Sequence, residues 1–260
     1  MLYRYTLYKL RLPIKKCVVP CHNVSTPKGA SSEKKAEVYK NLWLRTFKNI
    51  QVFSESQLSV LKSMHTDKNI LLAYLMLKDY GVPHGVVLPP NDKIGFLFFG
   101  KIVKYKRLDL LLEAVNILVE RGEERFCVTI AGNCKDWTQY SELIKYPEFV
   151  KTRIERIPNE DVAGLFALNH YCVLPYQDIA QSGAITVAFQ YNLPTIVSDI
   201  PQFEEFVIDG KTTLSFKSLD ALSLADVMQY AIENHAKLYD ELKGHQKELI
   251  AEKFADETIV

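Results

Sequence analysis

Residues 94–254 alternate between short apolar runs and longer segments whose apolar positions recur at helical spacing. The run 94–99 is apolar throughout, which is typical of a strand covered on both faces. Further strands are predicted at 126–131, 150–154, 171–174, 195–198 and 212–216. Helices are predicted at 108–119, 159–168, 182–191, 201–208, 222–232 and 238–254. Strands separated by helices of this length predict a parallel sheet with right-handed crossovers.

Single residues at the ends of these segments indicate where the helices begin and end. Gly122 follows the helix that starts near residue 108, and it suits the left-handed conformation of a carboxyl-terminal cap. Asn159 is a candidate N-cap for the helix that runs through residue 168. Asp209 and Gly210 should end the short helix 201–208.

The amino-terminal third shows the same alternation over fewer elements. Strands are predicted at 17–21 and 50–53, and helices at 33–48 and 55–64. Two or three strands and two helices are too few for a doubly wound sheet. This part of the chain therefore looks like the end of a domain whose first strands are missing.

Residues 88–93, Leu-Pro-Pro-Asn-Asp-Lys, have the composition of a linker, because consecutive prolines interrupt regular structure. The expected fold class is α/β, a Rossmann-like parallel sheet flanked by helices together with a partial second α/β domain. The partial domain covers 1–88, the Rossmann-like domain 92–235, and a helical tail 236–260.

Composition adds a charge asymmetry. The chain has 260 residues, is 48% hydrophobic and carries a net charge of +1. Residues 1–50, however, hold 11 Lys/Arg against 2 Asp/Glu. Such a basic segment could contact an anionic membrane surface or a polyanionic substrate, or it could be an ordinary solvated face.

The five cysteines are odd in number and scattered, so they do not indicate a disulfide framework, and a reducing cytoplasm fits best. Cys17, Cys21 and His22 lack a second pair at metal-ligand spacing, so no metal is predicted. Charges interrupt residues 1–16 too often for a signal peptide or a spanning helix. Any membrane contact is therefore expected to be peripheral, at the inner face.

Four loops follow predicted strands and should converge on the carboxyl edge of the sheet. They are 100–107, 132–135, 175–183 and 199–205. The first is basic, with Lys101, Lys104, Lys106 and Arg107, and suits a phosphate-bearing ligand unless it is simply a solvated loop. In another, Ser182 and Gly183 open a helix. They could bind phosphate, or cap the helix and allow close packing, and these roles are compatible.

Several short motifs carry a family resemblance through their order and spacing. They are Phe-Phe-Gly-Lys-Ile-Val-Lys-Tyr-Lys-Arg-Leu-Asp (98–109), Ala-Gly-Asn (131–133), Ile-Pro-Asn-Glu-Asp-Val-Ala-Gly-Leu-Phe (157–166), Leu-Pro-Tyr (174–176), Gln-Ser-Gly (181–183), Leu-Pro-Thr-Ile-Val-Ser-Asp (193–199) and Glu-Phe-Val-Ile-Asp-Gly (205–210). Over 92–256 the chain resembles the donor-binding half of group 1 (family 4) glycosyltransferases of the GT-B fold. Residues 19–24 and 52–56 are similar, more weakly, to the end of that family's acceptor-binding domain.

The resemblance implies a set of donor-binding positions. Lys101, where an arginine is usual, and Lys106 would bind the donor diphosphate beside Gly100. Asn133 and Glu205 would lie near the donor, and Tyr176 with Gln181, Ser182 and Gly183 would supply further contacts. His22 would face the cleft from the acceptor side as a base or a sugar-hydroxyl partner, or it would merely be hydrogen-bonded in place.

The chain departs from the family at one point. Many members carry two glutamates separated by seven residues, the second near the middle of the helix before a Gly-x-Pro turn. Counting back from Pro194 places these positions at Ile179 and Val187, with Asn192 for the glycine. The departure leaves the donor identity and the individual donor contacts open.

The expected function is transfer of a sugar from a nucleotide-sugar donor of UDP or GDP type, without a further cofactor. The acceptor would be a glycan or a lipid-linked glycan, in cell-surface polysaccharide synthesis. The alternative is a non-catalytic or split-enzyme nucleotide-binding module that lost its complete acceptor domain. A sugar-nucleotide epimerase of the same fold has less support, since no paired acid and base positions are found. Nucleic acid is not an expected partner, because the basic residues lack an RNA-binding aromatic pattern.

Overall fold

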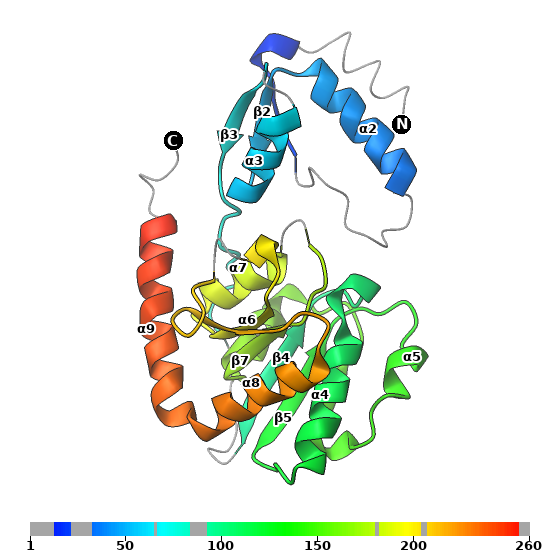
Figure 1. Ribbon diagram of the computed structural model, residues 1–260, viewed down its shortest axis with the longest axis vertical. Helices are drawn as coiled ribbons and strands as arrows, with labels where there is room; N and C mark the ends of the chain where they lie inside the picture. The colour runs from blue at the N-terminus through cyan, green and yellow to red at the C-terminus, as the bar shows by residue number, and fades with distance from the viewer. Residues whose placement is uncertain are drawn as a thin grey trace. The chain divides into compact units, whose positions relative to one another are not determined.

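The computed structural model describes residues 13–21, 33–64, 67–83, 93–179, 182–203 and 207–254 (Figure 1). The chain divides into two compact units. The first lies mainly within Met1–Leu75, and the second within Met76–Asp178 and Ser182–Ala255. Each unit is described separately below.

The first unit is a three-stranded parallel sheet with helices. Its strands are β1 (Val18–Pro20), β2 (Asn49–Val52) and β3 (Asn69–Leu72), in the order β1-β2-β3. The chain also forms η1 (Ile14–Lys16), α2 (Glu33–Thr46) and α3 (Glu55–Met64). Cys21, Leu44, Ile50, Val52 and Leu61 form its buried core. The two predicted strands and the two predicted helices are confirmed, whereas β3 was not predicted, because its residues lead into one long apolar run at 70–77.

The second unit contains a six-stranded sheet in which every pair of neighbouring strands is parallel. The strands are β4 (Ile94–Phe99), β5 (Phe126–Ala131), β6 (Val150–Arg153), β7 (Tyr171–Leu174), β8 (Thr195–Ser198) and β9 (Thr213–Phe216). Their order is β6-β5-β4-β7-β8-β9, which is the strand order of a Rossmann fold. Each predicted strand of this sheet is confirmed to within one residue at either end.

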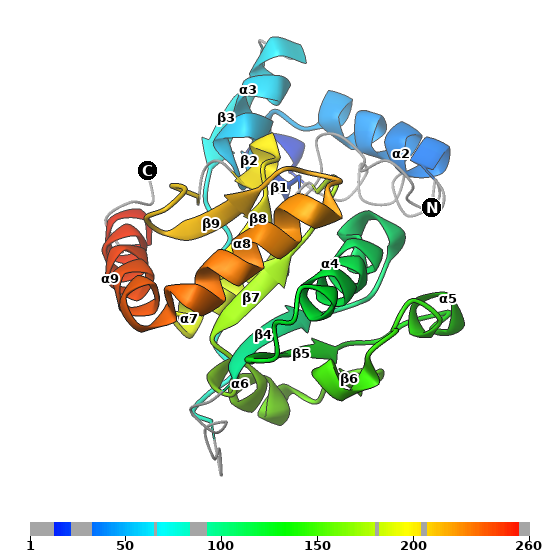
Figure 2. The ribbon, with the colours of Figure 1, turned by 60° about the horizontal axis from the view of Figure 1, so that its bottom comes forward.

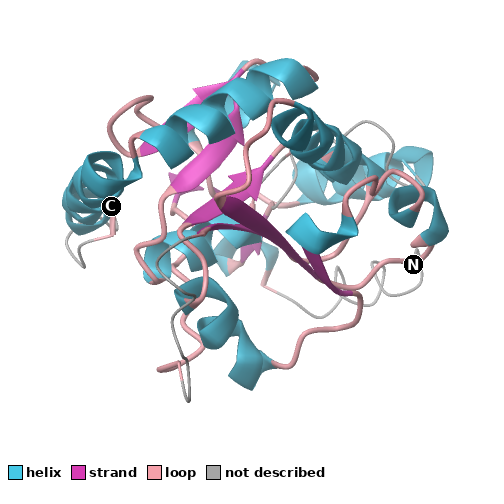
Figure 3. Ribbon diagram, turned by 90° about the horizontal axis from the view of Figure 1, so that it is seen from below, coloured by secondary structure: helices cyan, strands magenta, loops and turns pink. Residues whose placement is uncertain are grey.

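Helices lie on both sides of this sheet (Figure 3). They are α4 (Leu108–Glu120), α5 (Thr138–Ser141), α6 (Asn159–Ala167), α7 (Gly183–Gln190), α8 (Ala221–Glu233) and α9 (His235–Lys253). Single 3-10 turns occur at η2 (Lys104–Lys106), η3 (Pro147–Phe149) and η4 (Pro201–Phe203). Figure 2 shows α4 and α8 packed side by side over one face. The side chains of β7 and β8 are all buried, as expected for strands covered on both faces.

Of the helix ends predicted at Gly122, Asn159 and 209–210, the structure confirms one. Gly122 has a positive φ of 83° and donates its N–H to the Val119 carbonyl after α4, so the predicted cap is confirmed. The Asn159 prediction is wrong. Asn159 is the first helical residue of α6, Pro158 is the N-cap, and no side chain caps that end. The predicted helix 201–208 is too long: Pro201–Phe203 is a 3-10 turn, residues 204–206 lie outside the described residues, and 207–208 are not helical.

Candidate functional site

The loops that follow β4, β5, β7 and β8 meet at the carboxyl edge of the six-stranded sheet. The sequence order of the strands reverses between β4 and β7, and in open α/β sheets ligands bind outside such a switch point. The Ile102 N–H donates to the Asn133 carbonyl at 2.9 Å, and the Gln177 N–H donates to the Tyr105 carbonyl at 2.9 Å. The expected convergence of these loops is confirmed for their described residues.

The loops after β4 and β5 touch through two glycines. Gly100 has a φ of 102° and Gly132 a φ of 156°, values that favour glycine. A Cβ atom placed on Gly132 would lie 2.0 Å from the Gly100 carbonyl oxygen, which no side chain could tolerate. Gly132 therefore permits the close approach of the two loops that carry Gly100 and Asn133.

Lys106 is the central cation of the site. Its Nζ atom lies 3.5 Å from the Phe99 carbonyl oxygen, 5.0 Å from the centroid of the Tyr176 ring and 6.0 Å from that of Phe98. Burial lowers the pKa of Lys106 to about 8. No carboxylate of the described residues forms an ion pair with it. An ammonium held among a carbonyl and aromatic rings without a counter-ion is suited to receive an anion.

The other basic residues of the loop differ from Lys106. Lys101 and Lys104 have exposed side chains. Arg107 is tied to Asp109 by an ion pair of 2.7 Å. These four basic residues look equivalent in the sequence. Among them, Lys106 alone is partly buried and has no ion pair with a described residue. Lys101 remains available at the surface of the same loop.

Tyr176 lies beneath the Lys106 ammonium. Its side chain is 1% exposed, and its carbonyl accepts a short hydrogen bond from the Ser198 hydroxyl. Burial raises the pKa of Tyr176 well above its usual value, and the nearby Ser182 hydroxyl opposes that rise. The Tyr176 hydroxyl nevertheless meets hydrogen-bond geometry with no described residue.

Ser182 and Gly183 begin helix α7. The Ser182 hydroxyl accepts a hydrogen bond of 3.3 Å from the Ile185 N–H, so the predicted cap is confirmed. A Cβ atom on Gly183 would meet no described atom within 4 Å, so close packing does not explain this glycine. The backbone N–H groups at a helix start are the donors that anion binding of this kind uses.

Some of the remaining predicted site residues lie among the described residues, and others do not. The Asn133 side chain is exposed at the edge of the site. The positions counted for the two family glutamates, Ile179 and Val187, are both buried and apolar. His22, Gln181 and Glu205 lie outside the described residues, and their proposed roles stay predictions.

Gln177 and Tyr105 were not singled out from the sequence, although both lie in loops predicted to reach the site. Gln177 bonds to the backbone of Tyr105 and, through its side-chain oxygen, to Arg107. Such long-range partners leave no local pattern. The one feature of the sequence that could have indicated Gln177 is that it is a polar residue directly after the Leu-Pro-Tyr motif.

Two further searches of the described residues gave negative results. Within the described ranges no three His, Cys, Asp or Glu side chains are grouped so that they could hold a metal ion. None of the described helices combines the length and apolar character needed to cross a bilayer.

A family model described as "Glycosyl transferases group 1" matches residues 93–234, more than half of the chain. A search of curated proteins gave no match. Structural similarity was found to many solved chains at low sequence identity, which identifies a shared fold.

Three of the similar structures come from different organisms. A mutant of S. aureus TarM, in complex with Fondaparinux, alpha-GlcNAc-glycerol and UDP, aligns with a TM-score of 0.73 at 20% identity, over 89% of this chain and 46% of that chain. Sucrose-phosphate synthase from Thermosynechococcus elongatus aligns with a TM-score of 0.75 at 16% identity, over 98% of this chain and 68% of that chain. Anabaena Alr3699/HepE, in complex with UDP and glucose, aligns with a TM-score of 0.71 at 13% identity, over 93% of this chain and 68% of that chain. The chain thus spans about half the length of that TarM chain.

Proposed function

Since the chain belongs to the group 1 glycosyltransferases, we propose that it transfers a sugar from a nucleotide-sugar donor to an acceptor, with the donor diphosphate bound at Lys106. The observation that carries this proposal is the partly buried Lys106 ammonium, which has no carboxylate partner in the described chain. When the sugar bond breaks, the leaving nucleoside diphosphate gains negative charge. A fixed cation beside it stabilises the transition state more than the ground state.

Other groups of the same edge support diphosphate binding. The amino terminus of α7 adds backbone donors and positive potential. Lys101 adds a second, solvent-exposed positive charge in the loop that carries Lys106. Lysine in place of the family's usual arginine gives up the bidentate fork, so we assign Lys101 the weaker role. Asn133, Gly100 and Tyr176 complete the donor contacts in this proposal.

UDP is the first donor nucleotide to test, because two of the similar structures contain it. GDP is the second. A glycan or lipid-linked acceptor, in cell-surface polysaccharide synthesis, is the proposed destination of the sugar. We further propose a cytoplasmic location with peripheral membrane contact through the basic residues 1–50, whose excess of Lys and Arg favours an anionic surface.

Nucleoside diphosphates are expected to stabilise the purified chain against heat. A ligand at one hundred times its dissociation constant adds about 2.7 kcal/mol of stability, which corresponds to a rise in Tm of about 5 °C or more for a chain of this size. Differential scanning fluorimetry with UDP and GDP measures it. Uridine and guanosine, which lack phosphates, are the matched controls and should give much smaller shifts. An unchanged Tm with UDP, GDP and their sugar esters would contradict the proposal.

A non-catalytic nucleotide-binding module is the second candidate function. The observation that favours it is the pair of buried apolar residues, Ile179 and Val187, at the positions counted for the family glutamates. Such a module would bind UDP or GDP equally well, so binding does not separate the two candidates. Sugar transfer or donor hydrolysis by the purified chain would refute it.

A further inference from the structure

The loop that carries Lys106 is held to the neighbouring loop on either side of that lysine. The Gln177 N–H donates to the carbonyl of Tyr105, the residue before Lys106, at 2.9 Å. The Gln177 side-chain oxygen accepts from Nη1 of Arg107, the residue after Lys106, at 3.4 Å. One residue of the β7 loop therefore fixes both neighbours of Lys106.

The side chain of Arg107 is itself held by Asp109. Its Nε atom lies 3.0 Å from each Asp109 carboxylate oxygen, and its Nη2 atom lies 2.7 Å from one of them. The same carboxylate raises the pKa of Arg107 through this hydrogen bonding. A planar guanidinium bound on two edges has little freedom to turn. It can therefore transmit the position of helix α4, which contains Asp109, to the loop.

The backbone of Arg107 is unusual as well. It has φ 49° and ψ 48°, the left-handed conformation, and it both ends η2 and precedes α4. Arginine rarely occupies this region, so the surrounding contacts must hold it there. This strained junction lies directly after Lys106.

We propose that Arg107, clamped between Asp109 and Gln177, is a positioning residue that holds the Lys106 ammonium at the donor diphosphate site. The side chain of Lys106 has no ion pair of its own in the described chain, so its place depends on the loop. The role of this clamp in donor binding rests on the proposed function. The geometry of the clamp can be tested without any nucleotide.

Arg107→Asn is the informative substitution, because asparagine tolerates the left-handed conformation but is too short to reach Gln177. Without the clamp, Lys106 should move toward solvent, and its pKa should rise from about 8 toward its ordinary 10.5. The measurement is an NMR titration of 13C-labelled lysine side chains, with the Lys106 signal identified by its absence in Lys106→Arg. The dissociation constants of UDP and GDP should rise about tenfold, with uridine and guanosine binding unchanged.

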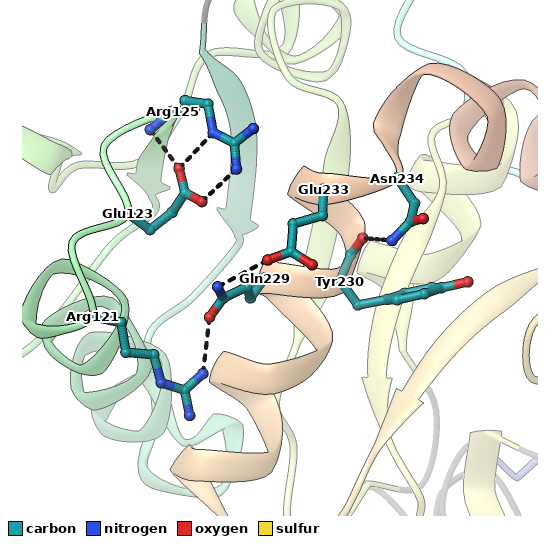
Figure 4. A network of polar contacts seen from close by, with 7 residues as sticks. All are labelled: Arg121, Glu123, Arg125, Gln229, Tyr230, Glu233 and Asn234. Carbon is teal, nitrogen blue, oxygen red and sulfur yellow. Dashed lines mark hydrogen bonds and ion pairs between the residues drawn. The ribbon is translucent and has the colours of Figure 1, made fainter.

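The control is Arg121→Asn at the other end of α4. Arg121 donates to Gln229 at 3.1 Å (Figure 4) and to Asp226 at 2.7 Å, so it has the same partner chemistry away from the site. This variant should leave both the Lys106 pKa and the UDP affinity as in the wild type. Gln177→Leu serves as a second test variant if Arg107→Asn does not fold, since it keeps the backbone bond to Tyr105.

Two outcomes would overturn the inference. One is an Arg107→Asn protein whose Lys106 pKa and UDP and GDP affinities match the wild type. The other is full recovery of both in Arg107→Lys, which keeps the charge but loses the planar fork, because charge alone would then suffice. Failure of the wild type to bind either nucleotide would contradict the proposed function instead. The titration of Lys106 would then still show whether Arg107 holds the lysine in place.

Discussion

Replacing Lys106 with methionine is expected to weaken UDP or GDP binding by about 10- to 100-fold. A hydrogen bond to a charged group contributes about 1.5–3 kcal/mol, and each 1.4 kcal/mol is a factor of ten. Methionine keeps much of the length of the side chain and removes the charge. Isothermal titration calorimetry on the two proteins measures the difference directly.

The same substitution should not destabilise the protein without nucleotide. Burial opposes the charged form of Lys106, as its lowered pKa shows, so an uncharged side chain relieves that cost. Loss of binding with an unchanged or raised Tm indicates a residue kept for function rather than for stability. Lys104→Met is the matched control, because Lys104 is exposed in the same 3-10 turn, and it should change the affinity by less than about threefold. Equal losses in the two variants would assign the effect to the overall charge of the loop.

Replacing Gly132 with alanine is expected to lower the free energy of unfolding by about 3 kcal/mol or more. The added Cβ would lie 2.0 Å from the Gly100 carbonyl oxygen and 2.6 Å from its carbonyl carbon, so backbone must move. Overpacking and an unfavourable φ both contribute to that cost. Urea denaturation followed by circular dichroism gives the value.

Gly183→Ala makes the same chemical change at a glycine with open space around it. No described atom lies within 4 Å of the position of its Cβ, and the residue starts a helix, where alanine is well tolerated. Its free energy of unfolding should stay within about 0.5 kcal/mol of the wild type. If the two alanine variants were equally stable, the close approach of the β4 and β5 loops would not be a structural requirement.

The apolar runs predicted the central strands of the six-stranded sheet correctly, because strands buried on both faces are apolar along their whole length. Residues 94–99 and 171–174 are examples. Some elements that are not buried on both faces were not predicted. The four-residue helix Thr138–Ser141 buries only Tyr140, and no polar residue separates the end of β3 from the apolar residues that follow it.

The position of the site could be predicted from the sequence, but the contacts between its side chains could not. The sequence placed a basic loop at the end of β4, because parallel strands bring such loops to one edge. It could not rank Lys101, Lys104, Lys106 and Arg107, since burial and pairing depend on residues far along the chain. Gln177, which bonds to both neighbours of Lys106, is the clearest example. The roles assigned to His22, Gln181 and Glu205 remain predictions.

The pKa of Lys106, measured by NMR with and without saturating UDP or GDP, tests the central claim most directly. Without nucleotide the ammonium should titrate near pH 8. Diphosphate charge favours the protonated form, so we expect the bound-state pKa to rise by at least about one unit. By linkage, nucleotide binding should be strongest below pH 8 and should weaken as the pH rises through the bound-state value. A Lys106 pKa that stays the same at saturating UDP and at saturating GDP would contradict the account.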